Sequence, residues 1–180
     1  MSALDKQPEN LNYLSPLGFR FILDRTPTTN YFVQLTSLPS ITLGDFDEAT
    51  PLVNLPYPGD KLRFNPFDIT FRVDEDMRNY KEIYDWLIGL GYPESTDQRA
   101  VFANQARGTN LSGGTGKDAV YSDASLIIMT SAQNPNVRIN FRDCFPIDLS
   151  TLQFNTTSQD VNYLEASATF RYSLYTIDLI

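Results

Sequence analysis

The sequence contains no histidine, and this absence excludes more chemistry than any other feature of its composition. Histidine is the most frequent general base, a common metal ligand and the partner of the nucleophile in Ser/His and Cys/His sites. Cys144 is the only cysteine, so neither a disulfide nor a thiolate zinc site can form within one chain. Its apolar sequence context predicts a small buried hydrophobic side chain instead. We therefore expect no catalytic residue, no cofactor and no metal site, and a protein that is not an enzyme.

Long apolar runs are also absent. No stretch reaches the length of a membrane span, and the first ten residues have neither the basic nor the apolar region of a signal peptide. We expect a protein that is assembled in the cytoplasm and not inserted in a membrane.

Basic residues are few, with 14 Lys and Arg against 22 Asp and Glu and a net charge of −8. Tight binding of nucleic acid through neutralised phosphates is therefore disfavoured. An acidic wall could instead let a nucleic acid pass without retaining it. Charge alone does not separate that use from plain solubility.

The sequence is rich in aromatic residues and in patterns typical of β-strands. Its 180 residues are 42% hydrophobic, enough for one sizeable core, and many of the twelve Phe recur in alternating segments typical of half-buried strands. We predict a mainly β protein, an antiparallel β-sandwich or barrel with one flanking helix. Residues 1–17, which are polar and contain two prolines, are predicted to form an N-terminal arm, and residues 18–180 a single domain.

Two hairpins are predicted from alternating apolar residues. The first joins strands within 19–36 through the turn-forming segment 26–30, and the second joins the apolar run 126–129 to the alternating segment 137–142. Residues 146–154 are expected to form a connection with a short strand. The chain closes with an alternating strand over 166–174 whose phase changes at Tyr175.

Residues 62–73 give the clearest strand pattern, but the phase of that pattern changes at Asn65-Pro66. A one-residue change of phase moves side chains to the opposite face, so a bulge or kink is expected there. Two shorter strands are the alternative.

One helix is predicted over about residues 75–89, where apolar residues recur at helical spacing after three acidic residues at 74–76. Capping explains this acidic cluster better than a metal site does. Residues 94–117 are polar and glycine-containing, which predicts a long surface loop. Gly116-Lys117 lies in this loop but lacks the spacing of a phosphate-binding motif, so nucleotide binding is not expected.

Residues 44–61 form an extended segment punctuated by prolines, which is either a loop or an edge hairpin that reaches away from the core. Its apolar side chains would be a liability on a monomer and suggest a contact surface. A loop folded back over its own core is an equally good interpretation. The candidate subunit or ring contacts are Phe46, Asp47, Pro51, Leu52, Val53, Leu55, Tyr57 and Pro58.

The order of these elements resembles the tail tube proteins of contractile-tailed bacteriophages over roughly residues 17–178. The resemblance includes an early F-x-F strand, a strand that ends in a Leu-Pro step, a proline-rich loop, a strand that leads into an acidic helix start, and a helix with a Trp. The matching segments are Phe19-Arg-Phe21, Thr36-Ser-Leu38-Pro39, Tyr57-Pro-Gly-Asp60, Phe67-Asp-Ile-Thr-Phe71, Asp74-Glu-Asp76, Tyr84-Asp-Trp86, Phe145-Pro146 and Ala168-Thr-Phe170. The polar insert at 94–117 departs from the smallest members of that family.

The resemblance implies a structural virion protein, a tail tube subunit that forms hexameric rings stacked around a channel for DNA passage into the host. It implies contact with itself, with tail sheath and with baseplate or neck proteins, and passing DNA without specific binding. The segment 44–61 would be the ring-to-ring contact and the arm 1–17 another. A related tube initiator or terminator at the baseplate or neck is the alternative within the same family.

Two other classes of function were weighed. A β-sandwich carbohydrate-binding module could use exposed aromatics such as Trp86, Tyr92 or Tyr121, although the helical position of Trp86 favours packing. An enzyme with paired carboxylates, as in glycoside hydrolysis, needs two acids opposed across a cleft, and no pattern in the sequence identifies such a pair.

Overall fold

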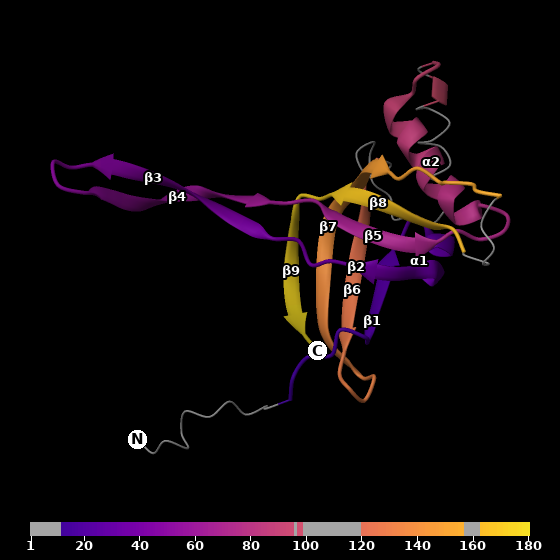
Figure 1. Cartoon of the computed structure of the whole chain (residues 1–180), viewed down its shortest axis with the longest axis horizontal. Helices are drawn as coiled ribbons and strands as arrows, with labels where there is room; N and C mark the ends of the chain where they lie inside the picture. The colour runs from indigo at the N-terminus through magenta and orange to yellow at the C-terminus, as the bar shows by residue number, and fades with distance from the viewer. Residues whose placement is uncertain (1–11, 96, 99–119, 157–162) are drawn as a thin grey trace.

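The computed structural model describes residues 12–95, 97–98, 120–156 and 163–180, which form strands and two helices (Figure 1). The helices are α1 (Pro27–Phe32) and α2 (Arg78–Gly91). The strands are β1 (Phe19–Leu23), β2 (Val33–Thr36), β3 (Ile41–Ala49), β4 (Asn54–Phe64), β5 (Phe67–Arg72), β6 (Ser122–Met129), β7 (Pro135–Leu149), β8 (Glu165–Arg171) and β9 (Leu174–Leu179). The predicted mainly β, antiparallel fold class is confirmed. No helix in these ranges is both long and apolar enough to cross a membrane.

Seven strands form one continuous hydrogen-bonded sheet, in the order β1-β6-β7-β8-β5-β2, with β9 also paired to β7. Every pairing is antiparallel. The long strand β7 belongs to two parts of the sheet. Its first part pairs with β6 and β9, and its last part pairs with β8. The body therefore has two layers that share β7.

The bend in β7 lies at Asp143, whose φ of 55° is unusual for a residue other than glycine. The register between β6 and β7 shifts at this point, as at a β-bulge. The Asp143 backbone N–H donates to the carboxylate of Asp123 at 3.1 Å, and the Ser173 hydroxyl donates to the carboxylate of Asp143 at 2.8 Å. Side-chain hydrogen bonds thus hold the chain where it leaves one layer for the other.

The core lies between these layers and is filled by alternate residues of the strands. Phe67 is fully buried and its ring centroid lies 4.7 Å from that of Phe141 and 5.5 Å from that of Phe170. Ala166 and Ala168 of β8 oppose Phe71 and Ile69 of β5, so small side chains face large ones across the sheet. This alternation is the period-two pattern read from the sequence.

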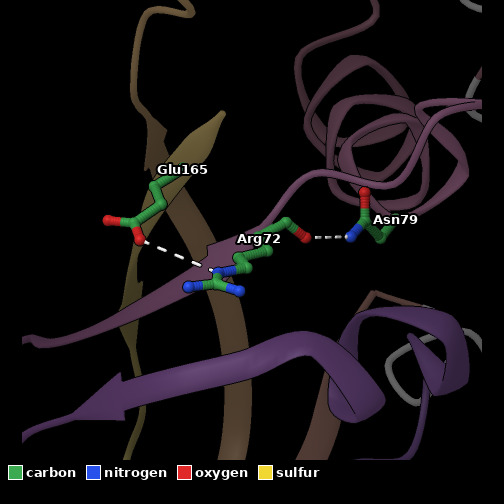
Figure 2. A network of polar contacts seen from close by, with 3 residues as sticks. All are labelled: Arg72, Asn79 and Glu165. Atoms are coloured by element: carbon green, nitrogen blue, oxygen red, sulfur yellow. Dashed lines mark hydrogen bonds and ion pairs between the residues drawn. The ribbon is translucent and has the colours of Figure 1, made fainter. Parts of the chain in front are cut away.

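Helix α2 covers one end of the body and buries Ile83 and Trp86 against it (Figure 1). The Trp86 indole N–H donates to the Val120 carbonyl at 3.1 Å. Buried Asn79 donates from Nδ2 to the Arg72 carbonyl at 2.6 Å, as Figure 2 shows. The Asn79–Arg72 contact joins the start of α2 to the end of β5. Arg72 Nε also lies 4.0 Å from a carboxylate oxygen of Glu165 on the neighbouring strand β8.

The first predicted hairpin is wrong. The segment 26–30 belongs mainly to helix α1, and β1 pairs with β6 while β2 pairs with β5. Pro27 lies at the first helical turn, where its fixed φ is favourable, so the composition taken for a turn also suits a helix start. Thr29 is buried, and its hydroxyl donates to the Asn79 carbonyl of α2 at 3.1 Å.

For the segment 62–73 the alternative of two shorter strands is correct, because β4 ends at Phe64 and belongs to a separate two-stranded sheet, whereas β5 belongs to the body. Two other boundaries differ from prediction. Strand β7 continues to Leu149 through Pro146, and the register shift there accommodates the proline. Helix α2 begins at Arg78, after the three acidic residues, rather than at 75.

Several predictions are confirmed or lie outside the described residues. The β6–β7 hairpin is present, and the phase change at Tyr175 marks the start of a separate strand, β9. Cys144 is buried as predicted. Residues 1–11 of the predicted arm and nearly all of the predicted loop at 94–117, including Gly116-Lys117, lie outside the described residues.

Candidate assembly surfaces

The β3–β4 hairpin is the most distinctive surface of the described structure. Its strands pair with each other and not with the seven-stranded sheet, and Figure 1 shows the hairpin projecting sideways from the body. At about 3.3 Å per residue it extends roughly 30 Å. An isolated two-stranded ribbon is marginal in water, so partners on either face would stabilise it.

The outer half of the hairpin has two different faces. Phe46 opposes Tyr57 in the register, and their rings stack with centroids 5.4 Å apart at an interplanar angle of 17°. Glu48 opposes Leu55 two residues further along, so Leu55 shares the aromatic face. The opposite face carries two acidic residues and two prolines, namely Asp45, Asp47, Pro56 and Pro58.

The tip of the hairpin exposes apolar side chains to solvent. Leu52 is 97% exposed and Val53 is 60% exposed. The turn is held locally, because the Thr50 backbone N–H donates to the Val53 carbonyl at 3.3 Å and the Val53 N–H donates to the Thr50 hydroxyl at 3.2 Å. An ordered turn with bare apolar residues is the kind of surface that another protein covers.

Midway along the hairpin the two strands approach unusually closely. A Cβ atom on Gly59 would lie 2.5 Å from the Gly44 carbonyl oxygen, closer than any side chain allows, whereas one on Gly44 would meet nothing within 4 Å. The register shifts beside this contact, between Leu43 and Asp45. Glycine at position 59 is therefore needed for the bulge that separates the outer half from the base.

The base of the hairpin is anchored to the body by aromatic side chains. The ring of Phe64 packs edge-on against Tyr172 and Tyr175, with centroids 6.0 and 5.7 Å apart. Asn65 Nδ2 donates to the Ser40 hydroxyl at 2.7 Å, which ties the two ends of the hairpin together. These contacts fix where the hairpin leaves the body.

A hollow of about 660 Å³ lies where the hairpin base meets the turn between β8 and β9. Three basic residues are among those that line it, namely Lys61, Arg63 and Arg171. None of them forms an ion pair within the described residues. The apolar part of its wall comes from Leu43, Leu62, Phe64 and Tyr172.

Three strands of the seven-stranded sheet have a free edge among the described residues, because β1 pairs with β6 alone, β2 with β5 alone and β9 with β7 alone. Ile177 and Leu179 on β9 are 54% and 84% exposed, and Leu35 on β2 is 58% exposed. An edge with exposed apolar residues is a template for pairing with another chain.

Every candidate contact residue predicted from the sequence lies on the β3–β4 hairpin and is exposed. The hairpin, rather than a loop folded over its own core, is the correct alternative for 44–61. The basic hollow was missed by the sequence reasoning, because Arg171 is more than a hundred residues from Lys61 and Arg63 in the chain. The bare edge of β9 was missed as well, since strand order is not visible in the sequence pattern.

Little in the structure suggests chemistry. The described residues hold no group of three His, Cys, Asp or Glu side chains that could bind a metal ion. Burial raises the pKa of the Cys144 thiol to about 12, which keeps it protonated and unreactive near neutral pH. Trp86 is 1% exposed, so it cannot serve as a carbohydrate platform, and the Tyr121 ring packs edge-on against Phe145.

Comparison with known proteins gives matches over nearly the whole chain. The tail tube terminator protein of Enterobacteria phage T4 is 24% identical over 174 residues, which cover 93% of this chain and 90% of the phage protein. No protein-family model matches the sequence. The resemblance to tail tube proteins is confirmed by this match and by solved structures.

Among solved structures, the tube-terminating cap of the anti-feeding prophage covers all of both chains with a TM-score of 0.60 at 12% identity. The sheath/tube terminator of an extracellular contractile injection system covers 94% of this chain and 99% of its own, with a TM-score of 0.56 at 14% identity. A chain from the sheath-tube complex of the same kind of system gives a TM-score of 0.55 at 12% identity, with 100% and 99% covered. At these identities the likeness is one of fold.

Proposed function

We propose that this chain is a structural protein of a contractile tail, which terminates the tail tube by forming a ring at its end. The match that carries the proposal is the full-length similarity to the phage tail tube terminator. Two of the similar structures are also terminators or caps of tubes. The sequence alone favours the tube body over the terminator, and these matches support the terminator instead.

A subunit of the tube body remains the second candidate. The similar fold within a sheath-tube complex favours it, since that match has nearly the same TM-score as the terminators. The two functions make different use of the same surfaces. A tube subunit must offer ring contacts on both ends, whereas a terminator joins a ring on one end and stops growth on the other.

Ring formation would use the surfaces described above. Free strand edges such as β9 can pair with the next copy, and head-to-tail contacts of this type close into rings when the rotation permits. We propose six copies for the ring, as the resemblance to tail tube proteins implies. The hairpin would then contact a neighbouring subunit or ring through Phe46, Asp47, Pro51, Leu52, Val53, Leu55, Tyr57 and Pro58.

The remaining partners follow from this position in a virion tail. A tube end would meet the sheath and the neck or baseplate proteins, and DNA would pass through the ring without being bound. The net charge of −8 supports this, because an acidic wall repels phosphate. We propose a role without catalysis, supported by the structural nature of the similar tail proteins.

The distinguishing experiment adds the purified, gold-labelled chain to tail tubes of the particle that encodes it and images them by negative-stain electron microscopy. A terminator labels one end of each tube and stops further growth by added tube subunits. Label along the whole tube would assign the chain to the tube body. Absence of label from tubes would refute both candidates.

A further inference from the structure

The hairpin carries charges of opposite sign at its two ends. Its outer half, residues 45–58, contains three acidic residues and no basic one, namely Asp45, Asp47 and Glu48, all exposed. The hollow at its base is lined by the exposed cations Lys61, Arg63 and Arg171. Asp60 lies in the same strand but does not line the hollow. The separation is unexpected in a chain with net charge −8.

The three basic residues of the hollow form no ion pair within the described part of the chain. The ion pairs found there join Arg72 to Glu165, Arg78 to Asp76 and Lys81 to Asp85, all away from the hairpin. Leu62 and Tyr172 also contribute an apolar part to the wall of the hollow. An occupant that suits it therefore combines carboxylates with apolar side chains.

The outer half of the hairpin has this combination. Glu48 lies on the face of the stacked Phe46–Tyr57 pair, Asp45 and Asp47 lie on the opposite face, and the tip presents Leu52 and Val53 to solvent. The hollow lies at the base of the hairpin, and Figure 1 shows the tip at the far end from that base, so the tip cannot fold into the hollow of its own chain. A second copy of the chain can supply it.

We propose that the acidic outer half of the hairpin of one copy docks in the basic hollow at the hairpin base of the next copy. The contact is head-to-tail, so each copy gives one tip and receives one, and a series of such contacts closes into a ring. The charges set the direction and register of the docking, and the apolar tip contributes buried area. This inference rests on the proposed ring-forming function and identifies the surfaces that form the contact.

The test uses two charge-reversed variants of the full chain. The hollow variant carries Lys61→Glu and Arg171→Glu, and the tip variant carries Asp45→Lys and Asp47→Lys. Association is measured by sedimentation velocity over a range of concentrations. We expect each variant alone to associate at least about tenfold more weakly than the unmodified chain, because like charges then face each other. Lys81→Glu, on the exposed face of α2, is the control and should associate normally.

An equimolar mixture of the two variants should recover association, since the acidic tip of one then meets the basic hollow of the other, and the reverse. A chain with all four substitutions should recover it too. Circular dichroism checks that each variant is folded. Association that ignores the substitutions, or that is lost in both variants and not recovered in the mixture, would overturn the contact while leaving ring formation standing. An unmodified chain that stays monomeric would overturn both.

Discussion

Phe67 packs against four other aromatic side chains in the core. Its ring lies within 6 Å of the rings of Phe21, Phe141, Phe170 and Tyr172. Because the two layers meet through these rings, loss of the side chain leaves a cavity that neither layer can close alone.

We therefore expect Phe67→Ala to lower the free energy of unfolding by about 3–5 kcal/mol. Chemical denaturation followed by fluorescence measures it. Phe154→Ala, at a side chain that is 73% exposed, is the control and should change stability by no more than about 0.5 kcal/mol. Equal losses in the two variants would contradict the position given to Phe67.

The buried ionisable groups of Cys144 and Tyr172 lead to a second prediction, which concerns stability at alkaline pH. Burial raises the pKa of the Cys144 thiol from 9.0 to about 12, and it raises the pKa of Tyr172 from 10.0 to about 12. Both groups therefore lose their protons at a lower pH in the unfolded chain than in the folded chain. Deprotonation at alkaline pH favours unfolding for this reason. Through these two groups, stability should not change between about pH 7 and 9 and should fall as the pH rises toward 12.

Urea midpoints measured across this range test the effect. Tyr172→Phe should reduce the alkaline fall and should not lower stability at pH 7, because the buried Tyr172 hydroxyl has no hydrogen-bond partner among the described residues. Cys144→Ala should likewise flatten the pH dependence, whatever its effect on stability at neutral pH. If stability falls just as steeply with pH in the variant that carries both substitutions, other groups cause the alkaline instability.

At the scale of elements, the β3–β4 hairpin depends on the close approach of Gly59 to Gly44. A methyl group at position 59 would lie 2.5 Å from the Gly44 carbonyl oxygen, so Gly59→Ala must push the strands apart at the bulge. The core does not include this hairpin, and we expect global stability to change by less than about 1 kcal/mol.

The expected result of Gly59→Ala is loss of association with little loss of folding, measured by sedimentation velocity and thermal unfolding. Gly44→Ala is the matched control at the same bulge, because a methyl group there meets nothing within 4 Å. If Gly59→Ala assembles as well as Gly44→Ala does, the shape of the hairpin does not matter for assembly.

The elements differ in how far the sequence predicts them. Helix α2, the β6–β7 hairpin and the projecting hairpin were visible because apolar periodicity and prolines are local signals. The first hairpin was mistaken because Thr26 to Asn30 suit a turn and a helix start equally, and burial of Thr29 against α2 decides between them. The strands β1 and β2 follow each other in the chain but lie in different parts of the sheet. A local sequence pattern contains no information on the order of strands in a sheet.

At the scale of the whole molecule, the eight predicted contact residues were found on one projecting element, yet half of the proposed contact was not predictable. Phe46, Leu52 and Tyr57 could be singled out since exposed apolar residues between prolines have no local explanation. The hollow forms only when β8 and β4 come together, which brings Arg171 beside Lys61. Such a site depends on tertiary structure, so sequence spacing gives no signal for it.

As a terminator, the chain is proposed to close into rings that do not extend into tubes by themselves. Negative-stain electron microscopy of the purified protein at high concentration, with mass photometry of the same sample, tests it most directly. We expect separate rings, with a mass about six times the 20.4 kDa of one chain. A strictly monomeric particle at every concentration would contradict ring formation, and long open-ended tubes would contradict the role of terminator.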